Sequence, residues 1–297
     1  MRNSVPIFLY ILMIIWIGFS WQAEAQDVPA PPLFDGGTGG AELHFVSPGG
    51  GGVACTQAQP CTLDQGIAQA TAGESVILLD GLYPQDIDTV RSGTPGNHIV
   101  IRAQNTRQAP IRAAVGNVVE IRHNYITIRG LFVNDLESSI KGQGTIRINA
   151  NGGIHHVIIE DNTMFHAGNV CLVMSGNNAQ DHHIIVRRNV CDGTAYNTDP
   201  GVEPPGEGFY IGVANAAPPG VADILIQGNE IRDFTSNAID LKQSSNRVWV
   251  WDNVIHGGVP FQDHGLAADV RDGLMVMQGT AGYAYNNVIR DSDAQSQ

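Results

Sequence analysis

Short runs of β-branched residues recur along the chain from residue 99 onward. Each run precedes two polar or small residues and often an asparagine, most clearly at 157–162, 184–189, 224–229 and 248–253, with a degraded copy at 283–287. Successive asparagines from Asn162 to Asn287 are 27, 40, 24 and 34 residues apart, a period typical of solenoids. The short alternating strands and the 35 glycines argue against long helices. The pattern predicts an all-β fold, a parallel β-helix of stacked coils over residues 76–290.

The recurring asparagine predicts a bend that is repeated in every coil. Asparagine tolerates the left-handed backbone that a tight bend requires, and stacked asparagines can hydrogen-bond along a solenoid as a ladder. We therefore expect a structural ladder formed by Asn162, Asn189, Asn229 and Asn253. The unequal spacing indicates one variable loop per coil, with long versions at 194–206 and 257–272. Insertions on a solenoid gather on one face, often the binding face, so these loops mark the expected site.

Both ends of such a solenoid need protection of their open strand edges. Near the N-terminus, the segment 62–65 fits a helix capping box, and Leu63, Ile67 and Ala70 form an apolar stripe on a helix expected to end near Gly73. We expect an N-terminal capping α-helix that plugs the first coil. At the other end, either the polar tail 291–297 folds over the last coil or the sequence is truncated and further coils are missing.

The first 25 residues have the pattern of a signal peptide, with Arg2, an apolar run at 5–19 and the small-x-small sequence at 23–25. An uncleaved anchor is the alternative, but the run is short for a span of about 20 residues. The tract that follows, 26–42, is rich in proline and glycine and predicts a flexible leader. We expect one domain over 43–297, a monomer without a membrane segment after cleavage, in a secreted or periplasmic protein.

Charge and cysteine content narrow the function. The formal net charge of -13 disfavours nucleic-acid binding, which needs a basic surface, and it also repels acidic glycans at long range. Four cysteines in an exported chain suggest two disulfides. We expect the local pairs Cys55 with Cys61 and Cys171 with Cys191, because the latter two occur in matching phrases nearly one coil apart.

A second strand in each coil can be aligned on its glycine-rich entrance, at 207–212, 237–242 and 272–277. Period-two alternation then directs Tyr210, Asp240 and Lys242 outward. At the entrance, Glu207 and Asn237 would stack in one column with Asp272. Oxygen ligands of this kind suit calcium, so calcium is a candidate cofactor held by Glu207 and Asn237; capping of turns explains the same groups.

These segments carry a family resemblance. The stretch 206–212, together with 238–246 one coil later, resembles secreted right-handed parallel β-helix proteins of the pectate-lyase-like superfamily, and more loosely the chondroitinase B and alginate lyase group, polysaccharide lyase family 6. The opening 45–50 and the segment 73–79 match the usual start of such proteins. The resemblance implies a polysaccharide partner and β-elimination on an acidic glycan, with Lys242 as the base. It also implies a calcium role for Glu207, but Asn237 stands where the lyases have a carboxylate.

Three readings remain open for this segment. In the lyase reading, Arg271 is the nearest candidate for a catalytic arginine although it falls in a variable loop, and Asp240 would raise the pKa of Lys242 through an ion pair. A glycoside hydrolase could use Glu207 and Asp240. A non-catalytic carbohydrate-binding or surface structural β-helix would bind through aromatic residues of the loop face, with Tyr196, Tyr210 and Phe261 as candidates.

Overall fold

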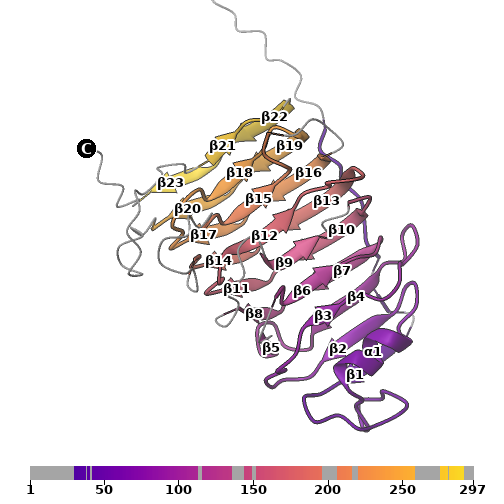
Figure 1. Ribbon diagram of the computed structural model, residues 1–297. Helices are drawn as coiled ribbons and strands as arrows, with labels where there is room; N and C mark the ends of the chain where they lie inside the picture. Colours follow the sequence, from indigo (N-terminus) through magenta and orange to yellow (C-terminus); the bar gives the residue numbers. More distant parts are fainter. Residues whose placement is uncertain are drawn as a thin grey trace, which may run out of the picture.

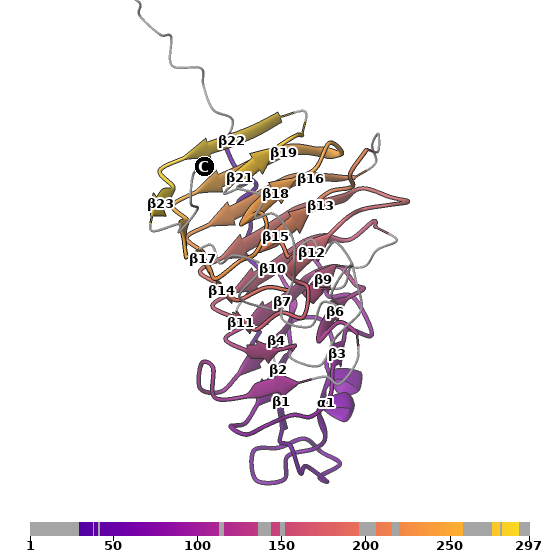
Figure 2. The ribbon, with the colours of Figure 1, turned by 60° about the vertical axis from the view of Figure 1, so that its left-hand side comes forward.

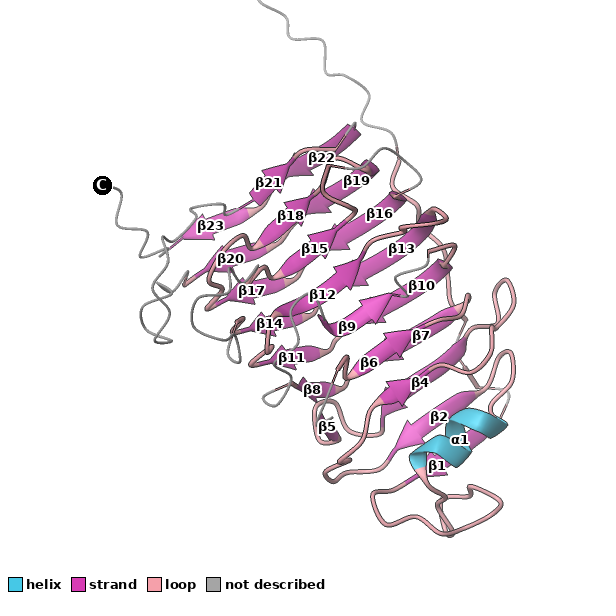
Figure 3. Cartoon of the chain, in the orientation of Figure 1, coloured by secondary structure: helices cyan, strands magenta, loops and turns pink. Residues whose placement is uncertain are grey.

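The computed structural model describes residues 30–37, 39–40, 42–112, 116–135, 144–148, 152–195, 206–215, 220–257, 275–279 and 281–290. The strands of these residues stack into three parallel sheets that run side by side along one elongated body (Figures 1 and 3). A coil passes once through each sheet, as β10, β11 and β12 do, and the next coil pairs with it strand by strand. The fold is a right-handed parallel β-helix, as the sequence predicts.

Sheet I has nine strands: β1 (Leu43–Val46), β2 (Ser75–Leu78), β4 (Ile99–Ala103), β7 (Ile126–Arg129), β10 (His155–Glu160), β13 (Asp181–Arg187), β16 (Val221–Gln227), β19 (Ser245–Trp251) and β22 (Ala281–Tyr285). Sheet II has seven: β5 (Pro110–Arg112), β8 (Phe132–Asn134), β11 (Thr163–Phe165), β14 (Val190–Asp192), β17 (Glu230–Arg232), β20 (Val254–His256) and β23 (Val288–Arg290). Sheet III also has seven: β3 (Ile87–Asp88), β6 (Val119–Ile121), β9 (Gly144–Ile148), β12 (Val170–Met174), β15 (Phe209–Ile211), β18 (Ile239–Leu241) and β21 (Met275–Met277).

Alternation within the strands builds the core. In β18, for example, Ile239 and Leu241 are buried inside the solenoid while Asp240 between them lies on the outer side. The same inward positions recur in neighbouring coils, so β-branched side chains stack in columns along the axis. One continuous apolar core runs from Val46 to Ile255, and this column packing fixes the register of every coil.

The asparagine ladder is confirmed, with one correction to its geometry. The Asn229 side-chain nitrogen donates to the Val186 carbonyl at 3.0 Å and to Oδ1 of Asn253 at 3.0 Å, while its own Oδ1 accepts from Asn189. Each link repeats in the next coil, from Asn162 to Asn287. The positive φ values belong to the residues immediately before the asparagines, Asp161, Arg188, Gly228, Asp252 and Asn286. The asparagine therefore satisfies buried backbone groups beside the bend, and its neighbour adopts the left-handed conformation.

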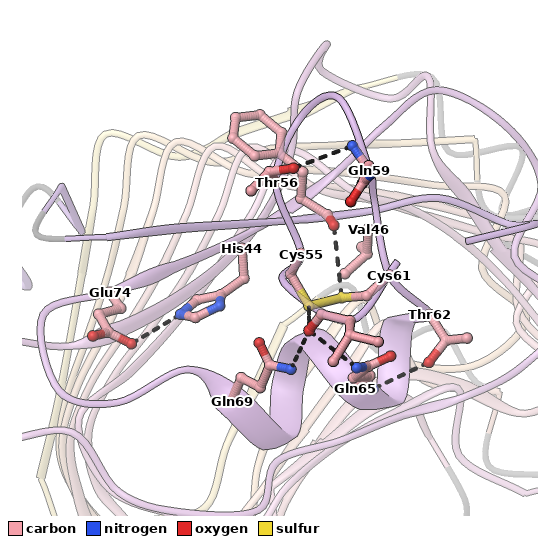
Figure 4. The surroundings of a disulfide bond; sticks show 12 residues. His44, Val46, Cys55, Thr56, Gln59, Cys61, Thr62, Gln65, Gln69 and Glu74 are labelled. Atoms are coloured by element: carbon pink, nitrogen blue, oxygen red, sulfur yellow. Dashed lines mark hydrogen bonds and ion pairs between the residues drawn. A yellow bond between two sulfur atoms is a disulfide. The ribbon is translucent and has the colours of Figure 1, made fainter. Parts of the chain in front are cut away.

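Helix α1 (Leu63–Gln69) covers the end of the stack beside β1 (Figures 1 and 2). The Thr62 hydroxyl accepts from the Gln65 backbone nitrogen, as a capping residue does, and Leu63 and Ile67 are buried. The helix ends at Gln69 with Ala70 as its C-cap, a little before the predicted Gly73. The side chains of Gln65 and Gln69 donate to the Val53 carbonyl, which ties the helix to the segment just before the Cys55–Cys61 disulfide; Figure 4 shows both glutamines beside that disulfide.

Both predicted disulfides are present. Cys55 and Cys61 close the loop ahead of α1, and Cys171 is joined to Cys191. The second pair connects β12 of one coil with β14 of the next, and both of its residues are fully buried in the core. It therefore staples two successive coils from the inside.

A segment that precedes the first coil lies along the outer face of sheet I; we call it the N-terminal strap, residues 30–37 and 39–40. It runs antiparallel to the direction of stacking, from the coil of β22, where Ala30 and Pro31 meet Tyr283, to the coil of β2, where Ser75 donates to the Gly39 carbonyl (Figure 1). An extended chain advances about 3.3 Å per residue, which matches a stack height of about 34 Å for seven coil steps. These residues, which lie in the predicted flexible leader, are packed on the solenoid.

The strap covers a row of apolar side chains that point outward from sheet I. This row consists of Ile158, Ile185, Leu225, Trp249 and Tyr283, with Trp251 beside it, and Phe34 of the strap packs against it. The Phe34 ring also lies 5.1 Å from the His156 ring. Exposing apolar side chains to water costs free energy. The strap removes this row from contact with water.

Candidate active site on sheet III

Strands β15 and β18 and the residues that flank them bring five predicted site residues together on the outer face of sheet III. Tyr210 pairs in register with Asp240, and Lys242 follows β18 in a turn in which the Ser245 hydroxyl donates to the Lys242 carbonyl. Glu207 lies just before β15, next to Asn237 of the following coil, whose carbonyl accepts from the Gly208 nitrogen. The alternation of the sequence predicts this grouping.

Lys242 is the centre of the cluster. Its Nζ lies 2.5 Å from Oδ2 of Asp240 and 3.7 Å from Oε1 of Glu207, and it also lies 4.5 Å from the centre of the Tyr210 ring. The lysine side chain is only 13% exposed. The interaction is therefore a largely buried ion-pair network with a cation–π contact.

The two carboxylates are more deeply buried than the lysine. The side chains of Glu207 and Asp240 are 6% and 2% exposed, and Asp240 accepts a further hydrogen bond of 2.7 Å from the side chain of Asn237. One oxygen of each, Oε2 of Glu207 and Oδ1 of Asp240, is buried without a hydrogen-bond partner among the described residues. Such oxygens are costly to bury without a partner.

This environment shifts three pKa values. Burial raises the pKa of Glu207 to about 7, although Lys242 opposes the shift, and nearby Asp240 adds to it. Burial alone would lower the pKa of Lys242, but the hydrogen bond and charge of Asp240, with Glu207, outweigh it and raise that pKa. Burial also raises the pKa of Tyr210. At neutral pH the free protein therefore holds an ammonium at Lys242 and a carboxyl at Glu207 that is close to half ionised.

The remaining predicted site residues, Tyr196, Phe261 and Arg271, lie outside the described residues, as does Asp272. A further cation reaches the same face from an earlier coil: Arg147 pairs with Val173, which pairs with Tyr210, all in one outward column. The Nε of Arg147 is buried without a hydrogen-bond partner in the part of the chain that the structure describes. Period-two alternation in β9 indicates from the sequence that Arg147 points outward. Its alignment with Tyr210 of β15 depends on the register of the coils.

Two groups of side chains offer ligand atoms for a cation. Glu207, Asp240 and the Asn237 amide are oxygen donors of the kind calcium prefers, and the two unpartnered carboxylate oxygens favour such a ligand, but the Lys242 ammonium already lies between the carboxylates. Among the described residues, Glu42, His44 and Glu74 form a second group close enough to share an ion. There His44 pairs with Glu74 at 2.9 Å, and Glu74 also accepts from the Thr71 nitrogen (Figure 4), so these contacts are explained by the turn ahead of β2.

Comparison with known proteins finds similarity to lyases that share the parallel β-helix fold. Residues 58–185 match the model of the chondroitinase B family, a region that ends before the cluster around Lys242. An uncharacterised protein, YwoF of Bacillus subtilis (strain 168), is 30% identical over 135 residues, which cover 42% of this chain and 29% of that protein. The match thus spans less than a third of the length of that relative.

Two solved structures share the fold. An alginate lyase from Paenibacillus sp. str. FPU-7 superposes with a TM-score of 0.60 at 17% identity, covering 84% of this chain and 76% of that one. A rhamnogalacturonan lyase gives a TM-score of 0.54 at 14% identity, covering 84% and 62%. Within the described part of the chain, no helix has the length and apolar character needed to cross a membrane.

Proposed function

We propose that this chain is a secreted polysaccharide lyase-like enzyme that cleaves an acidic glycan by β-elimination on the outer face of sheet III. The observation that carries the proposal is the convergence of Lys242, Tyr210, Glu207 and Asp240 on one strand pair of a lyase-like fold. β-Elimination requires a base for the proton next to the uronate carboxylate, a cation that neutralises that carboxylate, and an acid for the leaving oxygen. The cluster contains candidates for the base and for the cation.

Lys242 remains our candidate for the base, with a condition set by its surroundings. A base must be unprotonated, whereas Asp240 raises the pKa of Lys242 in the free protein. A substrate that excludes water and brings its own carboxylate to the cluster changes this balance only if Asp240 is neutralised at the same time. Glu207, whose pKa is about 7, is the second candidate for the base, and Lys242 would then neutralise the uronate.

Calcium is the candidate cofactor of this site. We propose that Glu207 and Asn237, with Asp240, would hold the ion. Bound there, calcium would supply positive charge that stabilises a uronate carboxylate and disfavours protonation of Lys242. Arg147 on the same face supplies a fixed cation within this chain, and Arg271 remains a proposed candidate for the same role.

One observation favours a second candidate, a glycoside hydrolase. Such an enzyme pairs a carboxylic acid that stays protonated near neutral pH with an ionised carboxylate. The raised pKa of Glu207 suits the acid, and Asp240, which shares the Lys242 ammonium with Glu207, is the candidate for the ionised carboxylate.

The test is product chemistry on defined polymers. The protein is incubated with alginate, pectate and chondroitin sulfate, with added calcium or with a chelator. New ultraviolet absorbance from unsaturated ends identifies a lyase, while new reducing ends without that absorbance identify a hydrolase. Neither signal on any polymer would contradict both enzymatic proposals and leave the carbohydrate-binding or structural alternative. The signal peptide proposal is tested by sequencing the N-terminus of exported protein, which we expect at Gln26.

A further inference from the structure

An arginine patch lies on the outer face of sheet I, a different face from the candidate active site. Arg102, Arg129, Glu160 and Arg187 pair in register on four successive strands, β4, β7, β10 and β13. They form one outward column because their neighbours in each strand point into the core. Arg188 follows Arg187 and joins the same network.

The buried carboxylate of Glu160 binds three of these arginines. The glutamate is 1% exposed, and it accepts from Nε of Arg129 at 2.5 Å and Nε of Arg187 at 2.7 Å, and from Nη2 of Arg188 at 2.8 Å. Burial raises the pKa of Glu160, but these arginines outweigh it and lower the pKa overall. The carboxylate is therefore ionised, and it fixes the orientation of the guanidinium groups above it.

The arginines keep donors available to solvent. The side chains of Arg129, Arg187 and Arg188 are 37%, 29% and 50% exposed. Arg187 uses its Nε for Glu160, and neither terminal nitrogen bonds to a carboxylate of the described residues. Free guanidinium N–H groups in a fixed orientation match the planar oxygens of carboxylate and sulfate.

Positive charge is in excess in this patch, although the chain carries -13. The four arginines face two acidic groups, Glu160 and Asp161, and Asp161 pairs with Arg188. Arg102 forms no ion pair with a carboxylate in the described ranges; burial and the neighbouring charge of Arg129 lower its pKa. Placing the unpaired Arg102 beside Arg129 brings two like charges together. An ion-pair network that served stability alone would not need Arg102.

We propose that this arginine patch is a secondary binding site for an acidic polysaccharide, separate from the site that contains Lys242. Arg102 and Arg129 lie one coil apart and Arg129 and Arg187 two coils apart, so with about 4.8 Å per coil the column extends over about 14 Å. That spread fits a polymer with repeated anionic groups better than one small anion. The shared chemistry is recognition of carboxylate or sulfate groups, and the site would hold the chain of a polymer while other parts of it reach sheet III.

Native gel electrophoresis with polymer embedded in the gel tests the proposal without requiring turnover. Polygalacturonate carries only carboxylates, dextran sulfate only sulfates, and unmodified dextran neither. We expect at least one charged polymer to retard the protein and dextran not to. The double variant Arg102→Gln, Arg187→Gln should weaken that binding by about tenfold, as expected for the loss of charge-assisted contacts.

Arg232→Gln is the matched control, because Arg232 lies on sheet II, is similarly exposed and pairs with Asp192. Equal losses in the control and the double variant would overturn the proposal. So would a lack of retardation by either charged polymer. Binding to phosphatidylserine vesicles without binding to either polymer would overturn it as well. Arg102→Gln alone removes no ion pair of the described residues, so a folded variant with reduced binding is obtainable even if Arg187→Gln destabilises the protein. Retention of polymer by a protein that has no turnover would support this site while contradicting the proposed enzyme.

Discussion

The ammonium nitrogen of Lys242 lies 2.5 Å from Oδ2 of Asp240, a carboxylate that is 2% exposed at its side chain. Glu207 lies beside this pair, so the charges of the three side chains depend on one another. Replacing any one of them changes the electrostatic environment of the other two. Removing the lysine leaves two buried carboxylates without a counter-charge. Activity and stability are therefore coupled at this position.

Lys242→Met should abolish lyase turnover and also destabilise the fold by about 3 kcal/mol at pH 8, as expected when one partner of a buried pair is removed. Lys242→Arg keeps a cation for Asp240 but cannot act as a base at neutral pH, so it should retain most of the stability and lose the turnover. Denaturant unfolding and the ultraviolet assay measure the two effects. Lys141→Met, at the only other lysine of the sequence, is the control. Full turnover in folded Lys242→Arg would refute the assignment of the base and favour Glu207.

Glu207→Gln should flatten the pH dependence of stability. Because the pKa of Glu207 is raised to about 7 from 4.5, the folded protein binds this proton more tightly than the unfolded chain does. The stabilisation is fully present below the unfolded pKa and is lost as pH rises from 4.5 through 7, by about 3 kcal/mol in total. Unfolding free energies at pH 5 and pH 8 should therefore differ by about 3 kcal/mol less in Glu207→Gln than in the wild type. An identical difference in both proteins would show that Glu207 titrates normally.

Glu207→Gln also separates the proposed activities. In a lyase with a calcium-assisted site, the amide should weaken turnover in a way that added calcium partly restores, because an amide oxygen still coordinates the ion with less charge. In a hydrolase, the loss should be complete and insensitive to calcium, since the acid itself is removed. Initial rates over a calcium titration distinguish the two. Asp240→Asn provides the paired measurement in the same assay.

Asn229→Ala should be among the most destabilising substitutions in the ladder. It removes the hydrogen bonds to Val186, Asn189 and Asn253 and leaves buried backbone groups unsatisfied, so a loss of about 3 to 5 kcal/mol is expected. Asn287→Ala in the last described coil has fewer partners and is partly exposed, so its cost should be clearly smaller. Denaturant melts of both variants provide the comparison. Equal costs would contradict the view that cumulative stacking makes the inner asparagines essential.

Deleting the N-terminal strap should expose the aromatic row of sheet I. If residues 1–25 are removed on export, Trp249 and Trp251 are the tryptophans that remain, and both lie in the region covered by the strap. A protein that begins at Glu42 should therefore show a red-shifted tryptophan emission and a lower melting temperature than one that begins at Gln26. Phe34→Ala should shift the emission in the same direction by a smaller amount. Unchanged emission in the deletion would show that the strap does not shield these rings.

The stacked coils, the capping helix, both disulfides and the ladder could be predicted from sequence because each depends on a local sequence pattern. A strand that alternates inward and outward residues is readable wherever it occurs, and so is a capping box such as the one at Thr62. The outward placement of Lys242 and Asp240 follows from the same alternation. Their burial does not, because it depends on Glu207 and Tyr210 of the preceding coil closing over them. The left-handed residue before each asparagine was misassigned because several residue types tolerate that conformation when a turn imposes it.

The sequence by itself determined the architecture of this protein, since a repeat with fixed strands and a variable loop leaves little freedom in how one coil follows the next. Only the tertiary structure decided which residues of different coils meet, because unequal loops hide the register between Arg102, Arg129 and Arg187, and between Arg147 and Tyr210. It also decided the place of the strap, whose proline- and glycine-rich sequence has no periodicity. The strap is ordered by the apolar row it covers on sheet I, and that row exists only once the coils have stacked.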